Sequence, residues 1–460
     1  MRIVIDNLGI PPLAGICNYE DACKPGYSVD FNVNLLKRYY FVKSRMNKIY
    51  AAHLARTPEW EVKCAFSLHL YLEAEHAASL RKRVSEMREP PLNMDKVTDP
   101  ALEQLMDELI RAADTRELLS GIHAVIKPEM IRSLEKHLAE TNPLIDYPTC
   151  RILLAILHEE KQMQAWGEKA LAALTQDGND ADMLAEWRGR LEWLQTQAGG
   201  IFGDMPTSEA ACPFDRRSDG TPYAIDPMPQ RDTRFIDPYN KSAEIDSYYR
   251  DESLSIDERT YALLYKRLRE MDVPEWMGPI LYTAKGKPCE YYVDMSRQLW
   301  DEARHAMMGE VGLNAHGVHF YKYPIDMNSS VSLNMELEPI EAHLILWAIE
   351  QGLMNKNTGK GWEFEIAQRS DHELAALFQD YDWADEVLHT QIGRKWLVPE
   401  IGSMEVLKTQ VDPLWKKWAD ATSKRASLSG HEQWWDRFIA DIRKQQKINK
   451  TEGTNHARAT

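Results

Sequence analysis

Apolar residues recur every three or four positions along most of the chain, and this spacing is the strongest constraint on its fold. The pattern runs from about residue 33 to 174, continues over 180–197, and returns from about 245 to 447. Because residues three and four apart share one face of a helix, it predicts an all-α protein with few or no strands. Strand-like sequence is confined to Arg2–Ile5 and His316–Tyr323.

The longest interruption of the helical pattern covers residues 198–244, where Pro, Gly and Asp are frequent and no periodicity is left. A chain of 460 residues is too long for one ordinary core. The sequence therefore predicts an N-terminal helical domain over 1–197, a Pro-rich linker over 198–244, a second helical domain over 245–400, and a C-terminal helical extension and tail over 401–460.

Charge and composition narrow the possible partners. The formal net charge of −16 disfavours a broad nucleic-acid surface. No run approaches the roughly 18 apolar residues that a membrane helix needs, and Asp6 interrupts the early apolar segment that a secretory signal would require. The six cysteines are scattered without a CxxC pair, as in reduced thiols. These features predict a cytoplasmic protein that binds neither nucleic acid nor membrane.

Short motifs of the first helical stretch recur, in the same order, in the second. The pairs are Pro58–Trp60 with Pro274–Trp276, Glu73–His76 with Glu302–His305, and Glu160 and Gly167 with Glu386 and Gly393. The offset between copies changes at residues 278–290, a Gly/Pro/Lys stretch that suits a loop insertion. We interpret the pattern as an internal duplication. The alternative is chance similarity between amphipathic helices.

Two Glu-x-x-His motifs, Glu302/His305 and Glu386/His389, are the main candidates for chemistry. Residues three apart on a helix point the same way, so each motif directs one carboxylate and one imidazole at the same spot. One motif alone is a weak signal. Two on separate helices are what a two-metal carboxylate centre needs, together with one Glu from each of two further helices.

Sequence distance suggests the two further Glu residues. Ligands at the middle of neighbouring antiparallel helices lie about 30–40 residues apart. Glu350 lies 36 residues before Glu386; the alternative is a solvated Glu. Glu258 lies 44 residues before Glu302, and the predicted loop at 278–290 accounts for the excess. Weaker candidates are Glu338, Glu341, Glu244 and Glu252.

Four segments together resemble the ferritin-like di-iron-carboxylate superfamily, and most of all a little-characterised bacterial branch of it. They are Asp301–His305, Ile349–Leu353, Ser370–Leu377 and Asp385–Trp396. The resemblance covers roughly residues 245–400, with a fainter echo over 33–175. It implies two ferritin-like helical bundles in tandem.

The resemblance also implies a cofactor of two Fe ions, or alternatively Mn/Fe or Mn/Mn. The implied metal ligands are Glu258, Glu302, His305, Glu350, Glu386 and His389. Among these, Glu302 and Glu386 would bridge the metals and serve as the catalytic carboxylates. The other two Glu would be terminal ligands, and each His would cap one metal.

The N-terminal copy departs from this pattern. Its retained ligand positions are Glu73, His76 and Glu160. Met163 stands where the second His belongs, and the positions counted for the other two Glu residues hold Ala124, beside His123, and Val42. With three of six ligands missing, this half is interpreted as a degenerate scaffold, and its remaining polar residues as a buried pair or a solvated face.

The resemblance leaves the reaction open. The favoured function is a non-haem oxidase or oxygenase that activates dioxygen to oxidise a small organic substrate, with an electron donor and a homodimer as further expectations. The chain is far longer than the bundle that iron storage needs. The alternatives are iron handling or peroxide detoxification, and a structural or partner-binding helical module without catalysis. Hydrolytic two-metal chemistry fits this ligand pattern less well.

Overall fold

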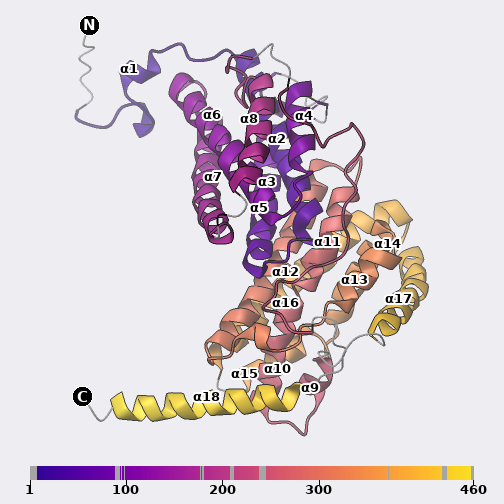
Figure 1. Cartoon of the computed structure of the whole chain (residues 1–460). Coiled ribbons are helices and arrows are strands. Elements are labelled where there is room, and N and C mark those ends of the chain that lie inside the picture. The colour runs from indigo at the N-terminus through magenta and orange to yellow at the C-terminus, as the bar shows by residue number, and fades with distance from the viewer. Residues whose placement is uncertain are drawn as a thin grey trace. The chain divides into compact units, whose positions relative to one another are not determined.

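The computed structural model describes residues 8–88, 94, 96–97, 99–176, 178, 181–207, 212–237, 245–370, 372–426 and 433–456. All regular structure in these residues is helical, as the apolar spacing predicts (Figure 1). The strand-like segment His316–Tyr323 instead contains a single 3-10 turn, η4 (Phe320–Lys322). The other strand-like segment, Arg2–Ile5, lies outside the described residues.

The chain forms two compact units. The first unit consists of residues 1–49 and 72–224, and the second of residues 50–71 and 225–460. The division at 224/225 falls inside the Pro-rich segment 198–244. Residues 50–71, which join two long helices, belong to the second unit although they are distant from most of it in sequence.

The helices of the first unit bring a group of buried charged side chains together, Lys43, Glu73, Lys127 and Glu160. In chain order its elements are η1 (Leu13–Gly15), α1 (Tyr19–Ala22), α2 (Val29–Leu54), α3 (Trp60–Ser85), α4 (Pro100–Leu109), α5 (Thr115–Ser120), η2 (Gly121–Ile126), α6 (Lys127–Glu140), α7 (Tyr147–Leu174) and α8 (Ala181–Gln197); the last residues of α2 and the first of α3 belong to the second unit. The η2 segment is a π-helical turn that joins α5 to α6 without a break.

In the second unit, the helix–helix contacts close four helical columns into a ring. The elements of this unit are α9 (Asp246–Arg250), α10 (Ile256–Arg269), α11 (Asp272–Thr283), α12 (Cys289–Asn314), η4, α13 (Asn328–Glu336), α14 (Pro339–Leu353), α15 (Lys360–Gln368), α16 (Glu373–Ile401), α17 (Met404–Ala426) and α18 (Trp435–His456). The broken column α10–α11 packs on α12, α12 on α16, α16 on α14, and α14 on α11. The short helix α15 packs on both α10 and α16.

The predicted loop insertion at 278–290 is wrong, because α11 continues to Thr283 with Gly278 and Pro279 inside it. A Cβ on Gly278 would lie 2.7 Å from the backbone oxygen of Ala51, so the glycine serves close helix packing rather than a turn. Only residues 284–288 connect α11 to α12. The length of this connection sets which residue of the α10–α11 column lies opposite Glu302 on α12.

An aromatic cluster anchors α18 to the second unit. The ring of Tyr265 on α10 stacks on Trp434 at 4.5 Å between centroids and meets Phe438 edge-on at 5.3 Å. The Tyr265 hydroxyl donates a hydrogen bond of 2.7 Å to the backbone oxygen of Pro324. Tyr265 is therefore a core residue. Within the described part of the chain, no helix combines the length and apolar character that crossing a bilayer requires.

Candidate metal centre

Five of the six predicted ligands meet inside the ring of the second unit, each at most 2% exposed. They are Glu302 and His305 on α12, Glu350 on α14, and Glu386 and His389 on α16. Nδ1 of His389 lies 3.1 Å from Oε1 of Glu302, 3.5 Å from Oε2 of Glu386 and 3.9 Å from Oε1 of Glu350. The four side chains offer ligand atoms within 4.8 Å of one another, close enough to hold one metal ion. We call this group position A.

The sixth prediction, Glu258, needs correction. Its carboxylate closes a capping box with Ser255 at the start of α10 and forms an ion pair with Arg443. Burial would raise the pKa of Glu258, but the bonds from Ser255 and the Arg443 charge hold that pKa below its usual value. This carboxylate lies apart from the other five because it sits in the first turn of α10, whereas Glu270, which reaches the centre, follows the last residue of that helix.

Glu270 takes the place predicted for Glu258. It follows the last residue of α10 and lies 32 residues before Glu302, within the 30–40 residues expected for facing helices. Oε2 of Glu270 lies 3.5 Å from Nδ1 of His305, and Oε2 of Glu302 lies 3.7 Å from the same atom. These three side chains form a second group able to hold a metal ion, which we call position B.

Each histidine is oriented by the aspartate of the opposite motif. Nε2 of His305 lies 3.1 Å from Oδ2 of Asp385, and Nε2 of His389 lies 3.4 Å from Oδ2 of Asp301. Arg304 donates to both aspartates. With Nε2–H bound to a carboxylate, each imidazole presents Nδ1 to the centre, the arrangement typical of metal-binding histidines. The sequence carried a signal for this, since Asp precedes Glu in both motifs.

Two buried cations border the centre, and sequence reasoning missed both. Nζ of Lys360, at the start of α15, lies 2.7 Å from Oε1 of Glu386, 2.8 Å from Oδ1 of Asp382 and 3.4 Å from Oε1 of Glu270. Arg267 pairs with Asp382 and, at 3.0 Å, with Glu270. A third potential ligand group, His305 with Asp382 and Glu386, therefore has two carboxylates that already bind the Lys360 ammonium.

Negative charge is in surplus at the centre. Burial, together with the charges of Glu386 and Glu302, raises the pKa of Glu350 well above its usual value. Burial alone would lower the pKa of both histidines, but the neighbouring carboxylates outweigh it, and both pKa values lie well above the usual value. The carboxylates are Asp382 and Asp385 at His305, and Asp301 and Glu302 at His389. Without a metal, protons must take up this charge.

The atoms facing the centre lack hydrogen-bond partners among the described residues. They are Oε2 of Glu270, Oε1 of Glu302, Oε2 of Glu350, Oε2 of Glu386, Nδ1 of His305 and Nδ1 of His389. A buried polar atom without a partner costs free energy, so a set of six calls for an explanation. All six are acceptors when the histidines are neutral, which is the chemistry of a metal-ligand set.

In the first unit, the predicted residues Glu73 and Glu160 bind two buried lysines. Nζ of Lys43 lies 3.0 Å from Oε2 of Glu73 and also pairs with Glu160. Nζ of Lys127 lies 2.9 Å from Oε1 of Glu160 and also pairs with Glu73. Glu73, Glu160 and His76 also lie close enough together to hold a metal. Two ammonium groups, however, already balance the two carboxylates.

No family model, curated protein or solved structure matches this chain. The assignment of a function therefore depends on the residues themselves and on their geometry.

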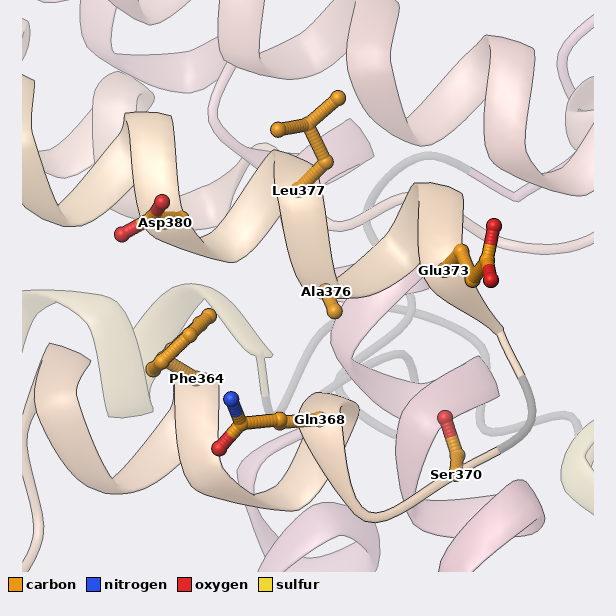
Figure 2. A pocket seen from close by; sticks show the side chains of 7 residues that line it. All are labelled: Phe364, Gln368, Ser370, Glu373, Ala376, Leu377 and Asp380. Carbon is orange, nitrogen blue, oxygen red and sulfur yellow. The ribbon is translucent and has the colours of Figure 1, made fainter.

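A surface pocket of about 530 Å³ lies between α15 and α16 (Figure 2). Phe364 and Gln368 line it from α15, and Ala376, Leu377 and Asp380 from α16. The same two helices supply Lys360, Glu386 and His389 to the centre, but none of the ligands lines this pocket.

Proposed function

We propose that this chain is a metal-dependent oxidase or oxygenase with a dinuclear centre in its second unit. The observation that carries the proposal is the set of six buried, unpartnered acceptor atoms on Glu270, Glu302, Glu350, Glu386, His305 and His389. Oxygen and imidazole ligands on four helical columns suit Fe and Mn, and two divalent ions would meet the surplus negative charge. We infer two Fe ions, with Mn/Fe or Mn/Mn as the alternatives.

Metal ions at positions A and B would supply the electrons with which dioxygen is activated. The chain's own residues prepare the site for them. Asp301 and Asp385 hold the imidazole tautomers so that Nδ1 faces inward, and Arg304 donates a hydrogen bond to both aspartates. The almost complete burial of the ligands excludes bulk water, which strengthens every charge interaction in the centre.

We further propose that the two units are tandem ferritin-like bundles, and that the first has lost its metal site. Matching glycines support the duplication. A Cβ on Gly167 would lie 2.1 Å from the His123 ring, and one on Gly393 would lie 2.6 Å from the Trp347 ring. In both units the glycine lies seven residues after a buried Glu, Glu160 or Glu386, and admits a ring from an earlier helical element, η2 for His123 and α14 for Trp347. The Lys43 and Lys127 ammoniums support the loss, since they replace the charge of metals.

The proposed substrate is a small organic molecule. Oxygenation uses two electrons from such a substrate and two from a donor, so the proposal includes an external electron donor. A peptide- or nucleic-acid-sized substrate suits the centre poorly, because its ligands are almost wholly buried. Homodimer formation stays a prediction.

The metal is tested by elemental analysis of protein from ordinary growth medium. We expect about two Fe or Mn per chain, a loss in Glu302→Gln, and unchanged content in the matched control Glu73→Gln from the first unit. Equal metal content in wild type and Glu302→Gln would contradict the metal assignment.

The reaction is tested with anaerobic protein loaded with ferrous iron and mixed with dioxygen in an oxygen electrode. We expect oxygen uptake in proportion to the loaded centres, absent in Glu386→Ala. Oxidation of many ferrous ions per chain into a mineral would favour iron handling instead. A loaded protein that is inert to oxygen would favour a structural module.

A further inference from the structure

The two metal positions differ in how many protein atoms they receive. Glu302 divides its carboxylate between them, with Oε1 toward His389 and Oε2 toward His305. Glu386 does not divide in this way, since Oε2 faces His389 while Oε1 lies 2.7 Å from Nζ of Lys360. Position A therefore has Glu302, Glu350, Glu386 and His389, whereas position B has Glu270, Glu302 and His305. Asp382 and Glu386 also lie close to His305, but the oxygens concerned bind the Lys360 ammonium.

The Lys360 side chain is held in place by the carboxylates around its ammonium group. Its Nζ lies 2.8 and 2.9 Å from the two oxygens of Asp382 and 3.4 Å from Glu270, and its side chain is fully buried. Glu270 is thereby also shared, with Oε1 toward the ammonium and Oε2 toward His305. A metal ion at position B would therefore lie near the positive charge of Lys360, which binds two neighbouring carboxylates, Glu270 and Glu386.

In the first unit, two lysine ammonium groups lie among the carboxylates. Lys43 and Lys127 each pair with both Glu73 and Glu160, so the charge that two metals would bring is supplied by two ammonium groups. Among the described residues of the second unit, the Lys360 ammonium binds the ligand carboxylates Glu270 and Glu386 in this way. The chain thus uses lysine in both units at the place where a carboxylate would otherwise bind a metal.

We propose that Lys360 makes the two metal positions unequal, so that an ion at position A is held tightly and an ion at position B weakly and exchangeably. The inference rests on the proposed function, because it requires that the centre binds metal. Lys360 is here a positioning residue: it acts by holding Oε1 of Glu386 away from position B. The weak position, with fewer protein ligands, is then the one at which small molecules gain access to a metal ion.

The test is a titration of metal-free full-length protein with Mn²⁺, following the electron paramagnetic resonance signal of the free ion. Wild type should bind in two steps whose dissociation constants differ at least about ten-fold, the range seen when one supporting group of a metal site is removed. Lys360→Met should tighten the second step about ten-fold and bring the two constants together. Lys360→Arg, which keeps the charge, should preserve the wild-type difference.

Lys266→Met is the matched control, because this buried lysine of α10 pairs with Glu363 and touches none of the ligands. It should leave both constants unchanged. Two equal steps in wild type would overturn the inference while leaving the proposed function intact, and this result does not depend on any variant folding. An unchanged difference in a folded Lys360→Met would also overturn it. Absence of any Mn²⁺ binding would overturn the proposed function and this inference together.

Discussion

Replacing Lys43 by Met tests the charge balance of the first unit without reference to metal. The Lys43 ammonium contacts Glu73 and Glu160, and all three side chains are at most 2% exposed. Its removal leaves two buried carboxylates with Lys127 as their remaining ammonium. Breaking a buried ion pair on one side costs about 3–5 kcal/mol, because the partner charge stays buried without compensation. We expect a loss of that size in the free energy of unfolding.

The assay is urea unfolding followed by tryptophan fluorescence. Lys161→Met on α7 is the control, since Lys161 pairs with Glu135 at the surface, with both side chains about half exposed. That change should cost less than about 1 kcal/mol. The double variant Lys43→Met/Glu73→Gln should recover most of the loss, because it restores neutrality. The reasoning is refuted if the Lys43 variant loses no more than the control, or if the double variant is no more stable than the single one.

Three further predictions concern the second unit. Glu270→Gln should lower the metal content measured by elemental analysis, whereas Glu258→Gln, which alters only a helix cap and a surface ion pair, should leave it unchanged. Asp301→Asn should weaken metal binding about 10–100-fold in a Mn²⁺ titration, because the carboxylate that orients an imidazole is lost; Asp294→Asn on the same helix is the control and should bind as wild type. Burial and the nearby lysine charge lower the pKa of His343 to about 3. As the pH drops below about 6.5, the imidazole of His343 takes up a proton in the unfolded chain but not in the folded one. The free energy of unfolding therefore falls, by about 3 kcal/mol at pH 4. Urea titrations over this pH range should show a shallower fall in His343→Asn.

The part of the site that depends on local helix geometry was predictable from the sequence. Glu302 with His305, and Glu386 with His389, share a helix face whatever the rest of the chain does. Glu350 was chosen for its distance of 36 residues from Glu386, and it does lie at the centre, although it is in the last turn of α14 and α15 intervenes before α16. The all-helical fold followed from the apolar spacing for the same reason.

The part that depends on where helices meet was not predictable. Choosing Glu270 over Glu258 required knowing that α11 continues through Gly278. The sequence alone does not distinguish a glycine that lets a neighbouring backbone approach from a glycine in a loop. The π-helical turn Gly121–Ile126 adds a similar difficulty, since it shifts the register of the residues that follow. Lys127 faces Glu160, although counting back 36 residues points to Ala124.

The buried lysines were missed because a sequence does not distinguish them from solvated ones. Lys360 begins a short helix after a Gly- and Asn-containing turn, a place where an exposed lysine is ordinary. Its burial depends on Asp382 and Glu386, which approach it only when α15 packs on α16. Sequence reasoning thus identified five of the six carboxylate and imidazole side chains at the centre, and missed Glu270 and the cations that share these carboxylates.

The paired ammoniums of the first unit matter for a newly made chain that has not yet met metal. Lys43 and Lys127 arrive with the same polypeptide as Glu73 and Glu160, so this unit can complete its packing during synthesis. In the second unit, like charges oppose the final approach of α12, α14 and α16 until protons or metal ions arrive. Under metal starvation we therefore expect nascent chains with a finished first unit and a loosened second one, which cellular proteases would cleave first.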